Sequence, residues 1–188
     1  MFLKKTRINI YELIDEYYNS LKNGRGKISK IDKKTFFYIP ISISIFLSLI
    51  GGVTKDYIVL IVTAMSIISG LLLNMLLLLT SEAKKEPSKH IDPDTRKQLI
   101  KETFSTISYT ILISMGLIIF LSIFYFLDFN KFNLSIYNCS FNIRNYPIFI
   151  GIAHFIYSVI VMSIIIHVFI NVLLIIRRIH KFFYYEIK

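Results

Sequence analysis

Four long runs without a charged residue dominate the chain. They cover residues 36–53, 57–80, 103–127 and 147–176. About 20 apolar residues are enough to cross the ~30 Å hydrocarbon core of a bilayer. A helix of a soluble bundle would instead carry a charged stripe that faces water. The runs therefore predict an all-α fold, a four-transmembrane-helix bundle within residues 36–176.

Residues 9–22, which precede the first run, show the spacing of a short amphipathic helix. Four apolar side chains at spacings of 4, 3 and 4 share one face of it: Ile10, Ile14, Tyr17 and Leu21. Acidic residues occupy much of the remaining surface, with Glu12 three positions after Asn9 in the pattern of a capping box. We expect a helix followed by a basic hinge at residues 24–27, which together form a cytoplasmic segment 1–35.

The apolar face of this first helix has two interpretations. It lies on the lipid headgroups or on the chain's own bundle, or it binds another protein. A helix that only coats anionic lipid carries a chiefly basic polar face, whereas positions 12, 15 and 16 here are acidic. Ile10, Ile14, Tyr17 and Leu21 are therefore the candidate partner-binding residues, and a soluble cytoplasmic protein is the expected partner.

The composition excludes several other classes of protein. The chain is 54% hydrophobic, 18% charged and has a mean hydropathy of +0.59, values that are foreign to disordered proteins. A single cysteine, Cys139, excludes a disulfide scaffold. The abundance of residues with AT-rich codons, such as Ile, Asn, Lys and Phe, is typical of a low-GC bacterium or of a horizontally acquired island.

The distribution of positive charge predicts the topology. Nineteen of the 22 Lys and Arg residues lie in segments 1–35, 81–102 and 177–188. The positive-inside rule places these segments in the cytoplasm, so we expect both termini of a multi-pass inner-membrane protein there. The net charge of +10 then reflects topology and attraction to the lipid bilayer, and we expect no direct nucleic-acid binding. The third helix should begin near Arg96, and the basic tail 177–188 should continue the fourth.

Polar side chains within the runs are the remaining candidates for function. The ones we single out are Asn74, His154, His167 and Asn171. They serve as packing contacts inside one protomer, as contacts between copies in a homo-oligomer, or as the lining of a wet pore formed by His167 and Asn171. Asn74 and Asn171 lie at similar depths and could pair, within a protomer or between protomers.

The sequence offers no catalytic, cofactor or metal motif. The runs contain no Asp or Glu, and the chain has neither a His-Glu zinc motif nor a Gly-x-Ser-x-Gly elbow. His90 and Asp92 are too few ligands for a metal site. We therefore expect a protein that is not an enzyme and has no cofactor.

In its size, its four runs within residues 36–176 and its basic cytoplasmic segments, the chain resembles the membrane subunit of Kiwa-type bacterial anti-phage defence systems. The resemblance implies a homo-oligomeric membrane sensor or scaffold that recruits a soluble DNA-binding partner. A pore-forming or holin-like effector is the alternative, and a small transporter or immunity protein is the third possibility.

Overall fold

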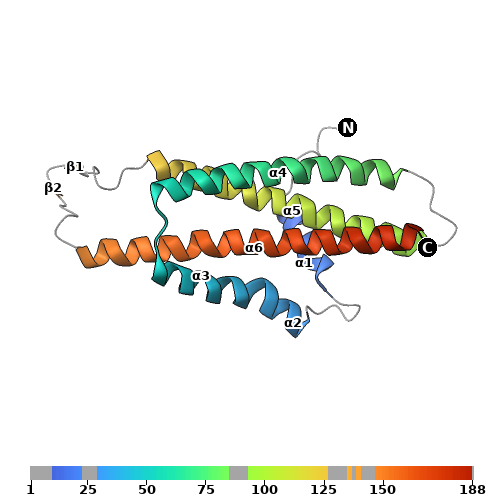
Figure 1. Ribbon diagram of the computed structural model, residues 1–188, viewed down its shortest axis with the longest axis horizontal. Coiled ribbons are helices and arrows are strands. Elements are labelled where there is room, and N and C mark those ends of the chain that lie inside the picture. Colours follow the sequence, from blue (N-terminus) through green and yellow to red (C-terminus); the bar gives the residue numbers. More distant parts are fainter. Residues whose placement is uncertain are drawn as a thin grey trace.

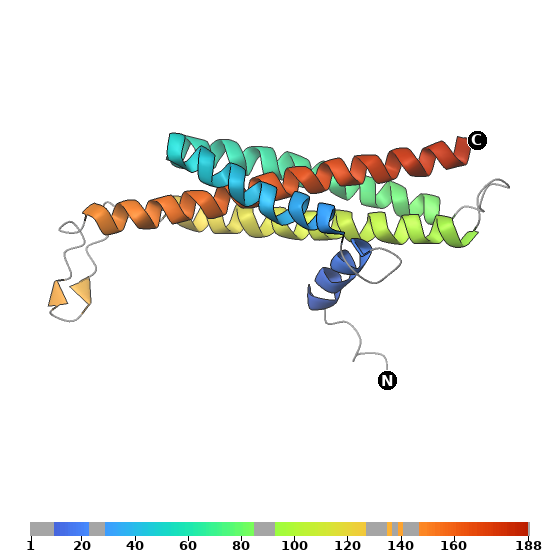
Figure 2. The ribbon, with the colours of Figure 1, turned by 90° about the horizontal axis from the view of Figure 1, so that it is seen from below.

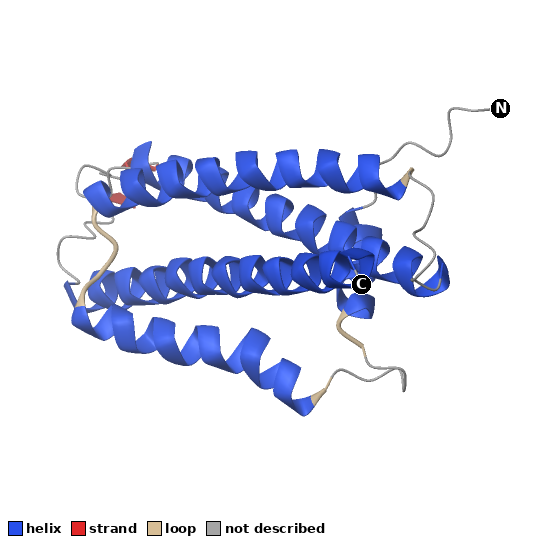
Figure 3. Ribbon diagram, turned by 45° about the vertical axis from the view of Figure 1, so that its right-hand side comes forward, coloured by secondary structure: helices blue, strands red, loops and turns tan. Residues whose placement is uncertain are grey.

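The chain is almost entirely helical (Figures 1 and 3). The computed structural model describes residues 10–22, 29–84, 93–126, 135–136, 139–140 and 147–187. Its elements follow in the order α1 (Ile10–Ser20), α2 (Lys30–Lys33), the π-helix η1 (Lys34–Tyr38), α3 (Ile39–Ile50), α4 (Lys55–Ala83), α5 (Pro93–Phe126), β1 (Ser135–Ile136), β2 (Cys139–Ser140) and α6 (Pro147–Ile187).

Within the described residues, four helical segments are long and apolar enough to cross a membrane. They are Lys30–Ile50, Lys55–Ala83, Pro93–Tyr125 and Ile152–Tyr184. The prediction of an all-α, four-transmembrane-helix bundle is therefore confirmed. The expected extensions of the third and fourth helices are present too, since α5 begins at Pro93 and α6 continues to Ile187.

Three of the long helices, α4, α5 and α6, enclose the main apolar core. One half of this core gathers around Leu121 and Val161, and the other around Ile107 and Ile175; all four side chains are buried. Each helix is apolar over most of its circumference. Only one side of each helix packs into the core, so many large apolar side chains remain exposed. That distribution suits a protein whose surrounding solvent is hydrocarbon.

Helix α3 packs on α6, on the far side from α4 (Figure 1). The buried residues of α3 are small or compact and recur every fourth position: Pro40, Ser44 and Ser48. Small side chains at this spacing let two membrane helices approach closely. The side of α3 that meets α6 is therefore built from small or compact residues rather than from large side chains.

Two local features depart from the predicted boundaries. The first membrane helix ends at Ile50 rather than at residue 53, because Gly51 is extended and Thr54 caps the N-terminus of α4 by accepting a hydrogen bond from the Tyr57 amide at 3.3 Å. Between α5 and α6, where we expected only a loop, β1 and β2 pair antiparallel over two residues each.

Helix α1 lies beside the bundle rather than in line with it, as Figure 2 shows. It packs against α5, and its side chains reach α6 and η1 as well. The capping residue Asn9, the hinge at 24–27, and the pair His90 and Asp92 fall outside the described residues.

Candidate functional site

The apolar face of α1 is used within the chain. Tyr17 is 1% exposed and Leu21 is 7% exposed, and both pack with Phe36 of η1 and Tyr109 of α5. Ile14 joins the edge of this cluster, whereas Ile10 stays exposed. The interpretation that this face binds another protein is therefore wrong for Tyr17 and Leu21, because the chain's own bundle covers them.

The centre of the contact is a buried hydrogen bond between α1 and α6. The Tyr17 hydroxyl donates to Oδ1 of Asn171 at 2.7 Å, and Asn171 is itself fully buried. The Asn171 amide in turn donates to the His167 carbonyl at 3.0 Å. The Tyr17 ring stacks on Tyr109, with centroids 3.7 Å apart and planes 5° from parallel. Burial, aided by the neighbouring Tyr109, raises the pKa of Tyr17 well above its usual range, so the hydroxyl remains a donor.

His167 joins α6 to the first membrane helix and to α5. Its Nδ1 lies 3.2 Å from the Phe36 carbonyl, and its Nε2 lies 3.2 Å from the Tyr109 hydroxyl. A carbonyl can only accept, so Nδ1 carries the proton, and in the neutral ring Nε2 accepts from Tyr109. Pro40 lacks the N–H that would bond the Phe36 carbonyl in a regular α-helix, which explains both the π-helical winding and the place left for His167.

Arg178 of α6 fixes the C-terminal end of α1. Its guanidinium donates to the Ser20 carbonyl at 2.9 Å, to the Glu102 carbonyl at 2.7 Å and to the Thr106 hydroxyl. It also lies 3.5 Å from the Glu102 carboxylate. Arg178 is only 9% exposed, so this charge is held by hydrogen bonds and an ion pair in place of water. A cation at a helix C-terminus also offsets the negative end of the α1 dipole.

We call this set of contacts the clasp: the buried polar groups that join α1 to the bundle. Its members come from four elements: Tyr17, Ser20, Phe36, Glu102, Thr106, Tyr109, His167, Asn171 and Arg178. Two of the predicted intramembrane residues, His167 and Asn171, therefore meet in one site. They act as packing contacts inside the protomer and line neither cavity described for this chain.

The other two predicted intramembrane residues lie elsewhere. His154 is near the opposite end of α6, where its ring lies beside Gly52 in the α3–α4 connection. Its neighbour Ser158 accepts a hydrogen bond from the Val53 amide at 3.2 Å. His154 and Ser158 therefore lie against the α3–α4 connection of this chain, although His154 is also exposed.

Asn74 does not pair with Asn171 within the protomer. Asn171 is buried in the clasp, whereas Asn74 lies on the exposed face of α4. Three further small or polar residues of α4 share that exposure: Thr63, Ser66 and Gly70. These four residues, at spacings of 3, 4 and 4, form one stripe of α4 that faces away from the bundle.

Several members of the clasp escaped the sequence analysis. Thr106 lies in the third run, in a buried series at spacings of 3, 4 and 4: Thr103, Thr106, Thr110 and Ser114. That periodicity was legible in the sequence and marks the polar side of α5. Arg178 carried no such signal, because a basic residue just beyond a membrane helix is indistinguishable from a solvated topology determinant.

The contacts of the clasp join helices to one another. Within the described residues, no group of three or more His, Cys, Asp or Glu side chains could hold a metal ion. The clasp residues bond to one another, and none of them lines either of the two cavities described. Comparison with protein families, curated proteins and solved structures finds no significant match to this chain.

Proposed function

We propose that this protein is a non-enzymatic membrane scaffold or sensor that presents α1 to a soluble partner. The observation that carries the proposal is the clasp, which ties a peripheral amphipathic helix to two membrane helices through buried polar contacts. Because Tyr17 and Arg178 reach α5 and α6 together, any change in the spacing of these helices changes how α1 is held. The position of α1 would therefore report on the membrane domain.

The surface offered to a partner is the outward face of α1. Tyr11 is 84% exposed, and the acidic side chains of Glu12 and Asp15 are exposed beside it. This mixed aromatic and acidic surface replaces the apolar face as the docking candidate. An exposed tyrosine beside carboxylates suits a protein contact better than adsorption to anionic lipid.

We propose a bacterial inner-membrane location with both termini in the cytoplasm. The support is the concentration of Lys and Arg in segments 1–35, 81–102 and 177–188, together with the resemblance to Kiwa-type membrane subunits. Cys139 would then face outward. Labelling of Cys139 by a membrane-impermeant maleimide in intact spheroplasts tests this arrangement, and labelling only after lysis would refute it.

The decisive experiment measures recruitment of the product of the neighbouring gene. Tyr11→Ala with Asp15→Asn should reduce its co-purification several-fold. The matched control, Tyr57→Ala with Asp56→Asn, removes the same groups from exposed positions at the opposite end of the bundle and should change nothing. Equal recovery with both double variants would exclude α1 as the docking surface.

We also propose that copies of the chain associate through α4. Asn74 has an exposed amide inside a charge-free run and no hydrogen-bond partner among the described residues. Copies inserted with one topology are related by rotation about the membrane normal, so Asn74 of one copy meets its equivalent at the same depth. An amide donates and accepts, and can therefore pair with itself.

The pore alternative makes a different prediction. His167 and Asn171, the expected pore lining, are bonded inside the clasp, so no observation favours a channel through one protomer. Vesicles loaded with a potential-sensitive dye distinguish the two functions. A scaffold leaves the imposed potential intact, whereas a pore collapses it.

A further inference from the structure

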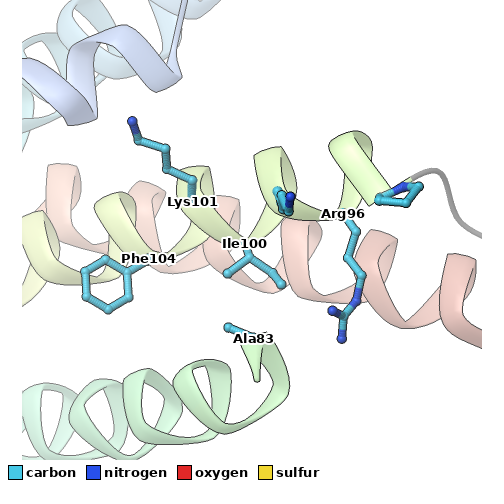
Figure 4. Close-up of a pocket in the computed structure, with 7 residues that line it drawn as sticks. Ala83, Arg96, Ile100, Lys101 and Phe104 are labelled. Carbon is cyan, nitrogen blue, oxygen red and sulfur yellow. The ribbon is translucent and has the colours of Figure 1, made fainter. Parts of the chain in front are cut away.

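A hollow of about 420 Å³ lies between the end of α4 and the start of α5 (Figure 4). Its walls are of two kinds. Ile100, Phe104 and Ala83 form an apolar side, while Arg96, Lys97 and the stem of Lys101 line the other. Ile100 and Arg96 both extend from α5 toward the end of α4 in Figure 4. Apolar and basic surfaces therefore meet in one concave site.

The position of the hollow matches the edge of the hydrocarbon. Phe104 is the second residue of the charge-free run 103–127, and Ala83 lies three residues past the end of the run 57–80. At 1.5 Å per residue, both are within about 5 Å of the boundaries of the apolar runs. The apolar wall thus lies at the level of acyl chains, and the basic wall at the level of phosphates.

The three basic residues of the hollow differ in their contacts with the rest of the chain. Arg96 is 5% exposed, donates to the Glu82 carbonyl at 2.9 Å and lies over the Phe182 ring. The Lys101 ammonium points away from Ala83 in Figure 4 and lies 3.5 Å from Glu16. Lys97 is exposed and has no partner among the described residues, so its ammonium is available to a ligand.

We propose that this hollow binds an anionic diacyl phospholipid, with the phosphate beside Lys97 and Arg96 and an acyl chain along Ile100 and Phe104. A free phosphate would use the basic wall but gain nothing from the apolar wall. A zwitterionic lipid would fill the apolar wall but bring an ammonium toward the cations. Asp94, in the first turn of α5, partly offsets the positive charge of the basic wall.

The chain contains no tryptophan, which makes a local fluorescent probe available. Phe104 is partly exposed, so Phe104→Trp places a single tryptophan in the hollow. The protein is reconstituted in vesicles that contain brominated phosphatidylglycerol or, at the same mole fraction, brominated phosphatidylcholine. Quenching should show a several-fold preference for phosphatidylglycerol at the hollow, because each cation near an anionic headgroup contributes roughly a fivefold change in affinity.

Lys97→Gln should bring that preference down about fivefold. The matched control is Lys34→Gln, which removes the same charge from an exposed position in another membrane segment that does not line the hollow. Equal loss in both variants would show a general surface potential and overturn the site. Equal quenching by both lipids would also overturn the site. Relief of the quenching by inorganic phosphate alone would point to a phosphate site instead.

Native mass spectrometry of the unmodified protein provides a readout that does not depend on the tryptophan substitution. Wild-type protein should retain phosphatidylglycerol in preference to phosphatidylcholine, and Lys97→Gln should lose that preference while Lys34→Gln keeps it. Retention of both lipids to the same extent would refute the proposal.

Discussion

Removing the Tyr17 hydroxyl should release α1 from the bundle. Tyr17→Phe keeps the ring that stacks on Tyr109 but leaves Oδ1 of Asn171 buried without its donor. An unsatisfied buried acceptor costs about 1–3 kcal/mol, while hydrogen bonds within membrane proteins average about 0.6 and reach about 1.7 kcal/mol. The contact lies at the edge of the membrane domain, so we expect about 1–2 kcal/mol.

A cysteine at position 21 can report this release. Leu21, the residue after α1, is buried against Phe36 and Tyr109, so Leu21→Cys in a Cys139→Ser background is protected from maleimide while the clasp is closed. Where α1 recloses faster than the reagent reacts, the labelling rate follows the opening equilibrium. A loss of about 1–2 kcal/mol then accelerates labelling about 5- to 30-fold.

Two controls make the test specific. Tyr11→Phe removes the same hydroxyl from an 84% exposed position on the same helix and should leave the labelling rate unchanged. A reporter cysteine at the exposed position Asp15 should label equally in all variants. Unchanged protection in Tyr17→Phe, or equal acceleration by Tyr11→Phe, would refute the clasp as the element that holds α1.

Three further predictions follow from the site and from α4. Arg178→Gln should lower the free energy of unfolding by about 2–3 kcal/mol, whereas Arg177→Gln, at an exposed position, should change the thermal midpoint in detergent little. His167→Leu should lower the free energy of unfolding by about 1–3 kcal/mol, because it removes the donor that bonds the Phe36 carbonyl. Adding Pro40→Ala supplies a backbone N–H for that carbonyl and should restore part of the lost stability in the same thermal unfolding measurement. Asn74→Leu should weaken the free energy of association between copies by about 0.6 kcal/mol, seen as a shift toward monomer in analytical ultracentrifugation. A wild type that is monomeric at all concentrations would refute the α4 interface.

The fold was predictable because the bilayer imposes a coarse rule on sequence. A run of some 20 residues without charge has few alternatives to a membrane-spanning helix, so the four spans could be read directly. Local backbone detail was less accessible. The π-helix at 34–38 depends on the carbonyl that Pro40 leaves for His167, and that partner lies 131 residues away in the chain.

The candidate site was only half predictable, for a related reason. The polarity of His167 and Asn171 identified them as groups that need partners, but the sequence could not say which partners. From the sequence, Tyr17 is one position of an apolar face that lies on lipid, on the bundle or on another protein. In the structure its hydroxyl donates to Asn171. The same helical period describes a face that meets lipid, another protein or its own bundle, and only the three-dimensional arrangement distinguishes them.

The pairing of α3 with α6 has a consequence for biosynthesis. A membrane helix can insert as soon as it is made, and assembly with its neighbours follows. Helix α3 is made before α4, α5 and α6, yet it packs on α6, which is made after the other two. Helix α3 therefore remains surrounded by lipid until α6 is made, and its large exposed apolar side chains suit that environment. Helix α1 also docks late, because its partners Asn171 and Arg178 belong to α6, so its contacts form only after the four spans have been made.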